Sequence, residues 1–412
     1  MINVIGLGYI GLPTALMLAS HGQEVVGTDY NKELVATLNA GKTTFQEDGL
    51  DELFAAAVKG GIQFTTEYQE TDMYIVSVPT PYDKFSKKVD PCYVVAAVKQ
   101  VLSVCPDGAT VVIESTISPG TIDKSVRPVI AESCKQVNLV HAPERIIPGN
   151  MVYELLHNNR TIGADDKAIG AMVKAYYASF CQGEIVVTDI RTAEMTKVVE
   201  NTFRAVNIAF ANELARICRH DNMDVYEIIR ICNMHPRVNI LQPGPGVGGH
   251  CISVDPYYLI QKAQVYGVLP RVMYNARRLN DGMGAYVANQ TIKCMNKKGV
   301  MVKDAKILIL GITFKENCPD IRNTKVVDIY HTLQEYTGNI TVCDPWAASD
   351  RVEKEYGISV VSQVPSDKFD AVILAVAHRE FQGLDVKALL KENGVIYDVK
   401  GFLDREIVDG RL

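Results

Sequence analysis

The chain lacks the features that mark membrane, secreted and nucleic-acid-binding proteins. No apolar run reaches the roughly 18 residues of a membrane-spanning helix, and no charged-then-apolar leader precedes the first strand. Lysine and arginine number 42 against 48 aspartates and glutamates, a net charge of −6, so the chain has no bulk attraction for nucleic acid or anionic membranes. We therefore expect a cytoplasmic protein in which local basic residues bind any anionic substrate.

Cysteine pairs are also missing. The ten cysteines are scattered, and none shows the Cys-x-x-Cys spacing of a zinc site or the framework of a disulfide-rich protein. We expect no metal, and we expect most of these cysteines to be small buried hydrophobic residues. At about 150 residues per domain, the 412 residues indicate two or three domains with ample core.

A dinucleotide-binding fingerprint is present at the start of the chain. A short apolar strand runs into Gly-x-Gly-x-x-Gly and then into a helical stretch. Gly6 turns the chain, and Gly11 lets the helix pack on the strand. Gly8, Tyr9 and Ile10 bring backbone amides to a pyrophosphate at the helix N-terminus, where the helix dipole favours anions.

Asp29 supplies the second part of this fingerprint. It follows the expected strand at 24–28, at the distance typical of a carboxylate that accepts from a ribose 2′-hydroxyl. The carboxylate would repel a 2′-phosphate, so NAD is favoured over NADP. A lone glycine motif is a weak signal, but strand, glycines, helix, strand and aspartate in register form a much stronger one.

Alternating strand and helix patterns continue through the N-terminal half. The further strands are expected at 73–78, 110–114, about 137–141 and 184–188, with a helix at about 93–104. This alternation predicts a doubly wound parallel sheet up to about residue 190. Helical periodicity then covers 192–220 and about 265–298, and we expect these long helices to link domains and supply a dimer surface.

A second α/β unit begins with the strand expected at 306–311. Further strands at 340–343, 371–376 and 395–397 and a helix near 326–336 follow it. Gly311 is not followed by the glycine fingerprint, so this half should bind a different nucleotide or none. The predicted fold is α/β, with two doubly wound Rossmann-like domains, 1–190 and 301–412, joined by a central helical dimerisation region, 191–300.

Two threonines lie in polar loops at the ends of N-terminal strands. Thr80 is part of Val-Pro-Thr-Pro at 78–81, and Thr116 is part of the loop at 114–120. Ligands bind at this edge of open α/β sheets, so we place both threonines beside the nicotinamide and its ribose. The alternative is that both loops are ordinary proline and glycine turns.

Three polar residues share one face of the helix at 192–220. Lys197, Asn201 and Arg204 are spaced four and three residues apart. Burying such groups without partners costs about 1–3 kcal/mol each, so they need hydrogen-bond partners. A lysine and an amide in one row can donate to an alkoxide, as an oxyanion hole requires. The alternative is a stripe of solvated polar residues.

Cys251 is expected in a loop, where it follows the glycine-rich run at 246–249 and precedes Asp255. A cysteine among glycines is often an inert buried residue. In a chain that binds a hydride acceptor, however, a thiolate can add to the aldehyde formed from an alcohol, and loss of a second hydride then gives a thioester that water cleaves to the acid. Asp255 could orient the water or the lysine, and the glycines would admit a bulky substrate.

These residues make the chain resemble the UDP-glucose/GDP-mannose dehydrogenase family over essentially its full length. The matching segments are 6–11, 78–81, 114–116, 143–145, 194–201, 248–256 and 311–315, with Asp320 and Arg322. The resemblance implies oxidation of the C6 alcohol of a sugar nucleotide to a carboxylate with two NAD. It also implies that Cys251 is the nucleophile, that Lys197 and Asn201 stabilise the oxyanion and bind substrate, and that Asp255 assists.

The resemblance assigns further roles outside this group. Glu144 and Thr116 would handle the hydrolytic water, and Arg322 would reach the NAD. The second α/β unit would bind the UDP half of the substrate through Phe314, Lys315 and Lys400.

Three segments bear on the substrate. The stretches 143–149 and 235–246 look like the N-acetylhexosaminuronate branch, and the second is very similar to UDP-N-acetylmannosamine dehydrogenases, whereas 315–324 resembles the UDP-N-acetylglucosamine members. We give the first two more weight, because the loop before Cys251 should touch the sugar. The expected substrate is a UDP-N-acetylhexosamine, with UDP-N-acetylmannosamine favoured. The further sugar contacts would be Arg145, Ile146, Arg204, His235, Arg237 and Gly246, with Arg237 reaching across a homodimer or higher homo-oligomer.

Other functions stay open at this point. The chain could be a UDP-N-acetylglucosamine 6-dehydrogenase, a two-electron alcohol dehydrogenase, or a non-catalytic protein that binds NAD or a nucleotide sugar, since fold alone does not establish function. The last two would not need Cys251 together with Lys197 and Asn201. Two NADH per sugar and a carboxylate product would distinguish the thioester route from both.

Overall fold

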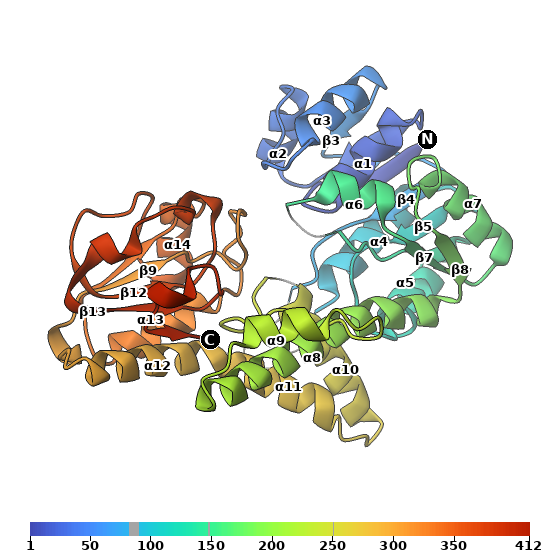
Figure 1. Ribbon diagram of the computed structural model, residues 1–412. Helices are drawn as coiled ribbons and strands as arrows, with labels where there is room; N and C mark the ends of the chain where they lie inside the picture. Colours follow the sequence, from blue (N-terminus) through green and yellow to red (C-terminus); the bar gives the residue numbers. More distant parts are fainter. Residues whose placement is uncertain (82–89, 147–148, 250) are drawn as a thin grey trace. The chain divides into compact units, whose positions relative to one another are not determined.

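The computed structural model describes residues 1–81, 90–146, 149–249 and 251–412, which form two units (Figure 1). Unit 1 comprises residues 1–200 and 257–262, and unit 2 comprises residues 201–256 and 263–412. Each unit has a sheet of its own.

Unit 1 contains an eight-stranded sheet with the order β3-β2-β1-β4-β5-β6-β7-β8. Its strands are β1 (Ile2–Ile5), β2 (Val25–Thr28), β3 (Gln63–Thr65), β4 (Met73–Val76), β5 (Thr110–Ile113), β6 (Asn138–His141), β7 (Arg160–Ala164) and β8 (Ile185–Thr188). Strands β1 to β6 run parallel, in the order of a dinucleotide-binding fold. All residues of β1, β2, β4 and β5 are buried, as expected for a parallel sheet with helices on both faces.

Side-chain alternation along the strands divides the core of unit 1 into two layers. In β4, Ile75 joins one apolar cluster, whereas Tyr74 and Val76 join the other. The first layer is covered by α1 and α3, and the second by α4. The helices are α1 (Gly11–Ser20), α2 (Lys32–Asn39), α3 (Leu50–Lys59), α4 (Cys92–Val104), α5 (Arg127–Glu132), α6 (Met151–His157) and α7 (Lys167–Tyr177), with a π-helical turn at Ile122–Val126. The predicted doubly wound architecture is confirmed.

The far edge of this sheet departs from the prediction of a purely parallel sheet, which is wrong there. β7 pairs with β6 antiparallel, with Val140 opposite Ala164 and His141 opposite Gly163, and β8 runs parallel to β7. The short α6 ends just before β7 begins. The connection that contains α6 therefore returns the chain as an antiparallel neighbour of β6.

A series of helices follows the first sheet. They are α8 (Ile190–His220), α9 (Val225–Cys232), α10 (Cys251–Val265), α11 (Arg271–Asp281) and α12 (Met283–Lys297). The helix expected at 192–220 is confirmed as α8. The single helical pattern expected at about 265–298 is two helices instead, because Gly282 ends α11 and precedes α12.

Unit 2 contains a six-stranded sheet with the order β11-β10-β9-β12-β13-β14, and all its neighbours are parallel. Its strands are β9 (Ile307–Leu310), β10 (Ile340–Cys343), β11 (Val360–Val361), β12 (Phe369–Leu374), β13 (Leu390–Asp398) and β14 (Gly410–Arg411), and its helices include α13 (Val326–Gln334) and α14 (Ser349–Tyr356). Helix α12 shares an apolar cluster with this sheet, in which Met283 and Val287 join Ile307 and Ile309. The second Rossmann-like fold is also confirmed.

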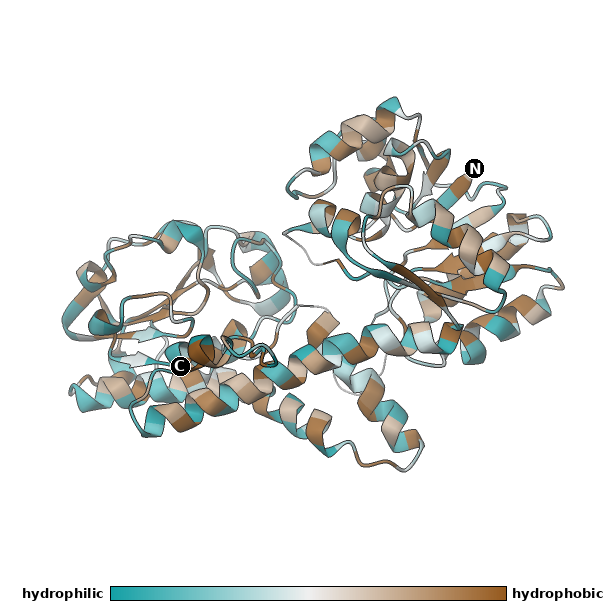
Figure 2. Ribbon diagram, turned by 45° about the vertical axis from the view of Figure 1, so that its right-hand side comes forward, coloured by the Kyte–Doolittle hydropathy of each residue, from teal (hydrophilic) through white to brown (hydrophobic). Residues whose placement is uncertain are grey.

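Hydropathy differs between strands and helices. Strand β9 is apolar throughout. Helix α8 carries polar and apolar residues along its whole length (Figure 2). Among the residues that the structure describes, no helix has both the length and the apolar character to cross a membrane.

Candidate active site

The glycine turn after β1 has the geometry that a dinucleotide site needs. Gly6 has a φ of +86°, which favours glycine at this turn. A Cβ atom on Gly11 would lie 1.9 Å from the carbonyl oxygen of Gly6, so α1 can pack on the turn only because Gly11 has no side chain. A Cβ atom on the exposed Gly8 would meet nothing within 4 Å, so its backbone is open to a ligand.

Asp29 is held at the end of β2 by backbone amides. Its Oδ2 accepts from the N–H of Leu7 at 2.8 Å, and its Oδ1 accepts from the N–H of Asn31 at 2.9 Å. The residue is 8% exposed. Each oxygen keeps a further lone pair, so the carboxylate fits the expected contact with a ribose hydroxyl.

The other cofactor candidates of unit 1 lie at the same end of the sheet. Tyr9 stacks on Phe45 with ring centroids 4.3 Å apart, and Ile10 packs beside it on the core. Thr80 is buried and Thr116 half-buried in the loops after β4 and β5, two adjacent parallel strands. These loops therefore leave the sheet at its ligand-binding edge.

Glu144 belongs to a buried charge cluster that the sequence did not reveal. Arg160 in β7 pairs with Oε2 of Glu144 and lies 3.8 Å from Oε1 of Glu114, and none of the three is more than 5% exposed. Ser77 and Tyr177 donate to Glu114 at 2.5 and 3.2 Å. Burial, and next the negative charge of Glu144, raises the pKa of Glu114 to about 7. An arginine that opens an apolar strand was the one sequence signal of this cluster.

Arg145 already has partners in unit 1. Its guanidinium donates to the carbonyl of Asn159 at 3.1 Å and to Oγ1 of Thr161 at 2.8 Å, and it pairs with Glu200 at 2.8 Å. Its backbone N–H donates to Oε1 of Glu144 at 2.6 Å. A substrate contact by Arg145 would have to compete with these interactions.

The polar residues of α8 are buried. Lys197 is 5% exposed and Asn201 is 6% exposed, which does not fit a solvated stripe. Nδ2 of Asn201 donates to Oδ2 of Asp255 at 2.6 Å, and the second amide hydrogen stays available to another acceptor. Arg204, on the same face, is half-buried.

Cys251 is the first residue of α10, so the expectation that it lies in a loop is wrong. The glycines before it and Pro256 inside the helix hid the helix start from the sequence pattern. Asp255 follows one turn later on the same side of α10. The first turn of a helix has unpaired N–H groups and the positive end of the helix dipole, which favour negative charge at that end. His250 lies outside the described residues.

The glycine run before Cys251 packs on the loop that follows β9. A Cβ atom on Gly248 would lie 2.7 Å from the Cβ of Phe314, and one on Gly249 would lie 3.0 Å from its ring. The N–H of Gly249 donates to the carbonyl of Arg322 at 2.9 Å, and its carbonyl accepts from Nδ2 of Asn323 at 3.0 Å. The start of α10 is therefore held against this loop.

A pocket in unit 2 is lined by residues of the glycine run before Cys251 and by residues of the loop after β9. Its walls include Gly246, Gly248, Thr313, Phe314, Glu316, Lys325 and Lys400. Lys400 lies 3.8 Å from Glu316, and Lys325 pairs with Asp281 at 3.2 Å and with Asp328 at 2.9 Å. Sequence reasoning missed Lys325, because only the folded chain brings it to the pocket.

Other predicted residues lie elsewhere. His235 and Arg237 are exposed and do not belong to the described lining of this pocket, and the N–H of Arg237 donates to Nδ1 of His235 at 3.3 Å. Nε of Arg322 donates to Asp320 at 2.9 Å. Ile146 is buried in the core of unit 1, and residues 147 and 148 of its segment lie outside the described residues.

Comparison with known proteins extends these observations. Models of the UDP-glucose/GDP-mannose dehydrogenase family match residues 1–181 as the NAD-binding domain, 191–282 as the central domain and 308–405 as the UDP-binding domain. The UDP-N-acetyl-D-mannosamine dehydrogenase of Methanococcus aeolicus is 39% identical over 98% of this chain and 92% of that protein. The UDP-N-acetyl-D-glucosamine 6-dehydrogenase of Salmonella typhi is 38% identical over 100% of this chain and 98% of that protein.

A solved structure agrees with this match. The UDP-D-ManNAc dehydrogenase of Pyrococcus horikoshii superposes with a TM-score of 0.89 at 32% identity, covering 98% of this chain and 96% of that one. The cofactor is NAD, as predicted. The chain belongs to the UDP-glucose/GDP-mannose dehydrogenase family.

Proposed function

We propose that this chain is an NAD-dependent 6-dehydrogenase that oxidises the C6 alcohol of a UDP-N-acetylhexosamine to the uronate, with Cys251 as the nucleophile. The observation that carries the proposal is the place of Cys251 in unit 2. The cysteine opens α10 two residues after Gly249, and Gly248 and Gly249 pack on Phe314, which lines the pocket. A nucleophile beside a ligand pocket is what a covalent route needs.

The chemistry balances with two NAD and one water. NAD, when bound to unit 1, supplies the hydride acceptor for both oxidations. The alcohol loses a hydride and a proton to give an aldehyde, and the Cys251 thiolate adds to its carbonyl carbon. Loss of a second hydride from this thiohemiacetal gives a thioester, and water displaces the thiol to give the carboxylate.

Lys197 and Asn201 are assigned to the oxyanion that forms on the substrate. Both are buried, so their hydrogen bonds act with little competition from bulk water. Asp255 accepts one amide hydrogen of Asn201 and thereby orients the other.

Glu144 and Thr116 are assigned to the hydrolytic water. Glu144 accepts from Arg160 with one oxygen and from the backbone of Arg145 with the other. Each oxygen keeps a further lone pair for a water hydrogen. The fixed carboxylate can therefore orient the water that attacks the thioester.

We favour UDP-N-acetylmannosamine over UDP-N-acetylglucosamine. The pocket residues Phe314 and Lys400, with the adjacent Lys315, suit a nucleoside diphosphate, because they offer an aromatic face and cationic side chains. The sugar choice rests on the segments 143–149 and 235–246. Relatives of nearly equal identity carry both substrate names, so the choice needs a direct assay.

That assay offers the purified protein NAD with UDP-N-acetylmannosamine or UDP-N-acetylglucosamine separately and counts NADH. The proposal predicts two NADH per sugar and faster turnover of UDP-N-acetylmannosamine. Faster turnover of the other sugar would overturn the substrate assignment. No NADH from either sugar would favour a non-catalytic binding protein.

A homodimer or higher homo-oligomer is part of the proposal. Large apolar side chains stand exposed along α8, with Val199 at 45%, Phe203 at 65%, Phe210 at 50% and Ile217 at 54%. Their spacing of four and seven residues places them along one side of the helix. A second copy of the chain would cover this side, and Arg237 is assigned to the partner's substrate.

A further inference from the structure

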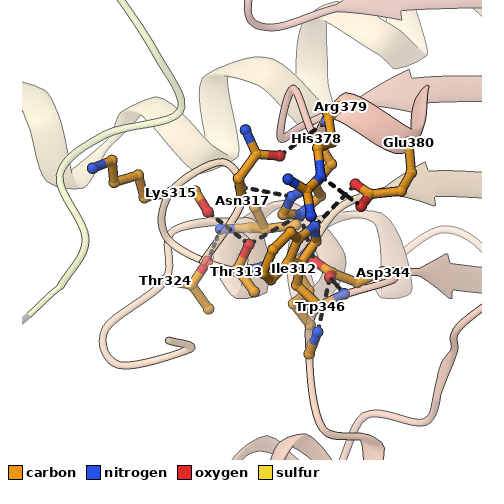
Figure 3. A network of polar contacts seen from close by, with 12 residues as sticks. Ile312, Thr313, Lys315, Asn317, Thr324, Asp344, Trp346, His378, Arg379 and Glu380 are labelled. Carbon is orange, nitrogen blue, oxygen red and sulfur yellow. Dashed lines mark hydrogen bonds and ion pairs between the residues drawn. The ribbon is translucent and has the colours of Figure 1, made fainter. Parts of the chain in front are cut away.

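His378 is a buried histidine beside the pocket loop, and the catalytic proposal does not use it. It is 0% exposed and follows β12. Its Nδ1 lies 3.0 Å from the backbone nitrogen of Asn317, and its Nε2 lies 3.1 Å from both Oγ1 of Thr313 and Oδ2 of Asp344 (Figure 3). The imidazole thus touches the loop after β9 at two points.

The hydrogen-bond partners fix the protons of this imidazole. The N–H of Asn317 donates to Nδ1, so Nδ1 carries no hydrogen. The hydroxyl of Thr313 donates to the carbonyl of Lys315 at 2.9 Å, so it can only accept from His378. The ring is therefore neutral, and its Nε2–H is shared between Thr313 and Asp344. A charged imidazole would turn an N–H toward the N–H of Asn317.

Asp344 has no open side for a ribose. Its Oδ2 accepts from the N–H groups of Ile312 at 2.6 Å and Thr313 at 3.0 Å, and its Oδ1 accepts from those of Trp346 at 2.8 Å and Ala347 at 2.9 Å. Asp29 has the same place in unit 1, yet fewer donors reach it. In unit 2 the imidazole of His378 adds a further contact to the Asp344 carboxylate, which agrees with the missing glycine fingerprint there.

The anchored loop forms a wall of the pocket. Thr313, Phe314 and Glu316 line the pocket, and the backbone of Asn317, at a left-handed φ of 54°, closes the turn. Such a φ is uncommon for a residue other than glycine and needs support from its surroundings. The Lys315 side chain points away from the imidazole (Figure 3). The hydrogen bonds of His378 therefore hold the loop at the side chain of Thr313 and the backbone of Asn317, without involving the Lys315 side chain.

We propose that His378, held by Asp344, is a positioning residue for the nucleotide half of the substrate. It fixes the loop at 313–317 before the nucleotide binds. Binding to Phe314 and Lys315 then does not lose the conformational entropy of ordering this loop. The inference rests on the proposed function in one respect, that the pocket binds the UDP half. Loss of the imidazole should weaken nucleotide binding and leave NAD binding, in unit 1, unchanged.

UDP is the probe, and the chain contains its own reporter. Trp346 is the single tryptophan of the 412 residues, and its ring stacks near that of His378 with centroids 6.4 Å apart. Tryptophan fluorescence of the full-length protein can follow titration with UDP. His378→Ala should raise the Kd for UDP about tenfold, because both hydrogen bonds of the imidazole to the loop, at Thr313 and Asn317, are lost. In turnover assays, KM for the nucleotide sugar should rise more than kcat falls.

Three variants separate positioning from a general loss of structure. His378→Gln should restore much of the affinity, because its amide can both accept from Asn317 and donate to Asp344. Thr313→Val keeps the shape but removes the link to Lys315, and should raise the Kd for UDP several-fold. Arg379→Ala is the matched control: its guanidinium lies 4.8 Å from the Trp346 ring, but its backbone contact to Asn317 stays, so the Kd for UDP should not change.

The outcomes distinguish the two proposals. Wild-type protein that does not bind UDP would overturn the proposed function. Wild-type protein that binds UDP, together with His378→Ala and Thr313→Val variants of unchanged affinity, would overturn the role of His378 alone. If His378→Ala does not fold, as judged by circular dichroism and NAD binding, Thr313→Val and His378→Gln decide between the outcomes.

Discussion

Two aspartates with similar local geometry distinguish the cofactor unit from the nucleotide unit. Asp29 and Asp344 each follow the second strand of their sheet and accept amide hydrogens from the turn after the first strand. Asp29 is 8% exposed, whereas Asp344 is fully buried against His378. Burial acts to raise the pKa of Asp344, but the hydrogen bond from His378 and those from the backbone N–H groups of Ile312 and Thr313 act to lower it. Only Asp29 therefore suits an incoming hydroxyl.

Asp29→Ala should weaken NAD binding and reduce the preference for NAD over NADP. The change removes a charge-assisted hydrogen bond of about 1.5–3 kcal/mol, and it also removes the repulsion of a 2′-phosphate. Titration of the variant with NAD and NADP measures both effects. Unchanged NAD affinity would show that Asp29 does not contact the ribose.

Lys197→Ala tests the oxyanion assignment. If Lys197 stabilises charge that develops in the transition state, kcat should fall by about 10²–10³ while KM changes little. Asn201→Ala should have a milder effect, and the double variant should fall short of additivity because both donors serve one oxygen. A raised KM with unchanged kcat would instead assign Lys197 to sugar binding.

Glu114→Gln tests the buried charge cluster through the pH dependence of stability. The pKa of Glu114 is raised from its ordinary 4.5 to about 7, so the folded state keeps a proton that the unfolded state loses. This contribution is fully present below pH 4.5 and is lost as the pH rises through 7. The free energy of unfolding of the wild type should therefore fall, relative to that of Glu114→Gln, between these limits. Parallel curves for the two proteins in urea titrations would contradict the assignment.

The sequence predicted those residues whose chemistry lies in local motifs. The glycines of the fingerprint, Asp29 and Cys251 are of this kind. Arg160 and His378 were not predictable, because their partners lie in other strands and loops that only the fold brings near. The helical spacing predicted that Lys197 and Asn201 share one face of the helix, but only the structure showed that Lys197 is buried.

The helices and strands that the sequence predicted are also those with a clear local pattern. Long periodic segments such as α8 and strands buried throughout, such as β9, were found within a few residues. The start of α10 was missed, because glycine and proline disfavour helix in isolation and tertiary packing overrides them. The short strands β3, β11 and β14 carry too few residues for a period to emerge, and β7 was missed as well.

The exposed side of α8 predicts an oligomer that a single charge should weaken. Phe203→Glu places a carboxylate among Val199, Phe210 and Ile217, and burial of one such phenylalanine is worth about 1.5–3 kcal/mol. Light scattering after size exclusion should give a lower mass for this variant than for the wild type. Met301→Glu, at an exposed position outside α8, should leave the mass unchanged. Equal masses for wild type and Phe203→Glu would contradict the α8 interface.

At the scale of the whole molecule, the same sheet order occurs in both units, but the residues at the nucleotide-binding turn differ. Strands β3-β2-β1-β4-β5-β6 and β11-β10-β9-β12-β13-β14 follow the same pattern, and Gly6 and Gly311 both have a positive φ after the first strand. The glycine fingerprint and an accessible aspartate accompany only the first. The chain thus uses one architecture for NAD and, by our proposal, for the nucleotide half of the substrate.

The most direct test of the covalent route is the amount of NADH formed per limiting nucleotide sugar by wild type, Cys251→Ser and Cys92→Ser. Cys92 is an exposed cysteine in unit 1, so its variant is the matched control. The account predicts two NADH and one uronate per sugar for the wild type and Cys92→Ser. It predicts no net four-electron oxidation for Cys251→Ser, because a serine alkoxide is hard to form and an ester is released more slowly than a thioester. A Cys251→Ser protein that forms two NADH per sugar at the wild-type rate would contradict it.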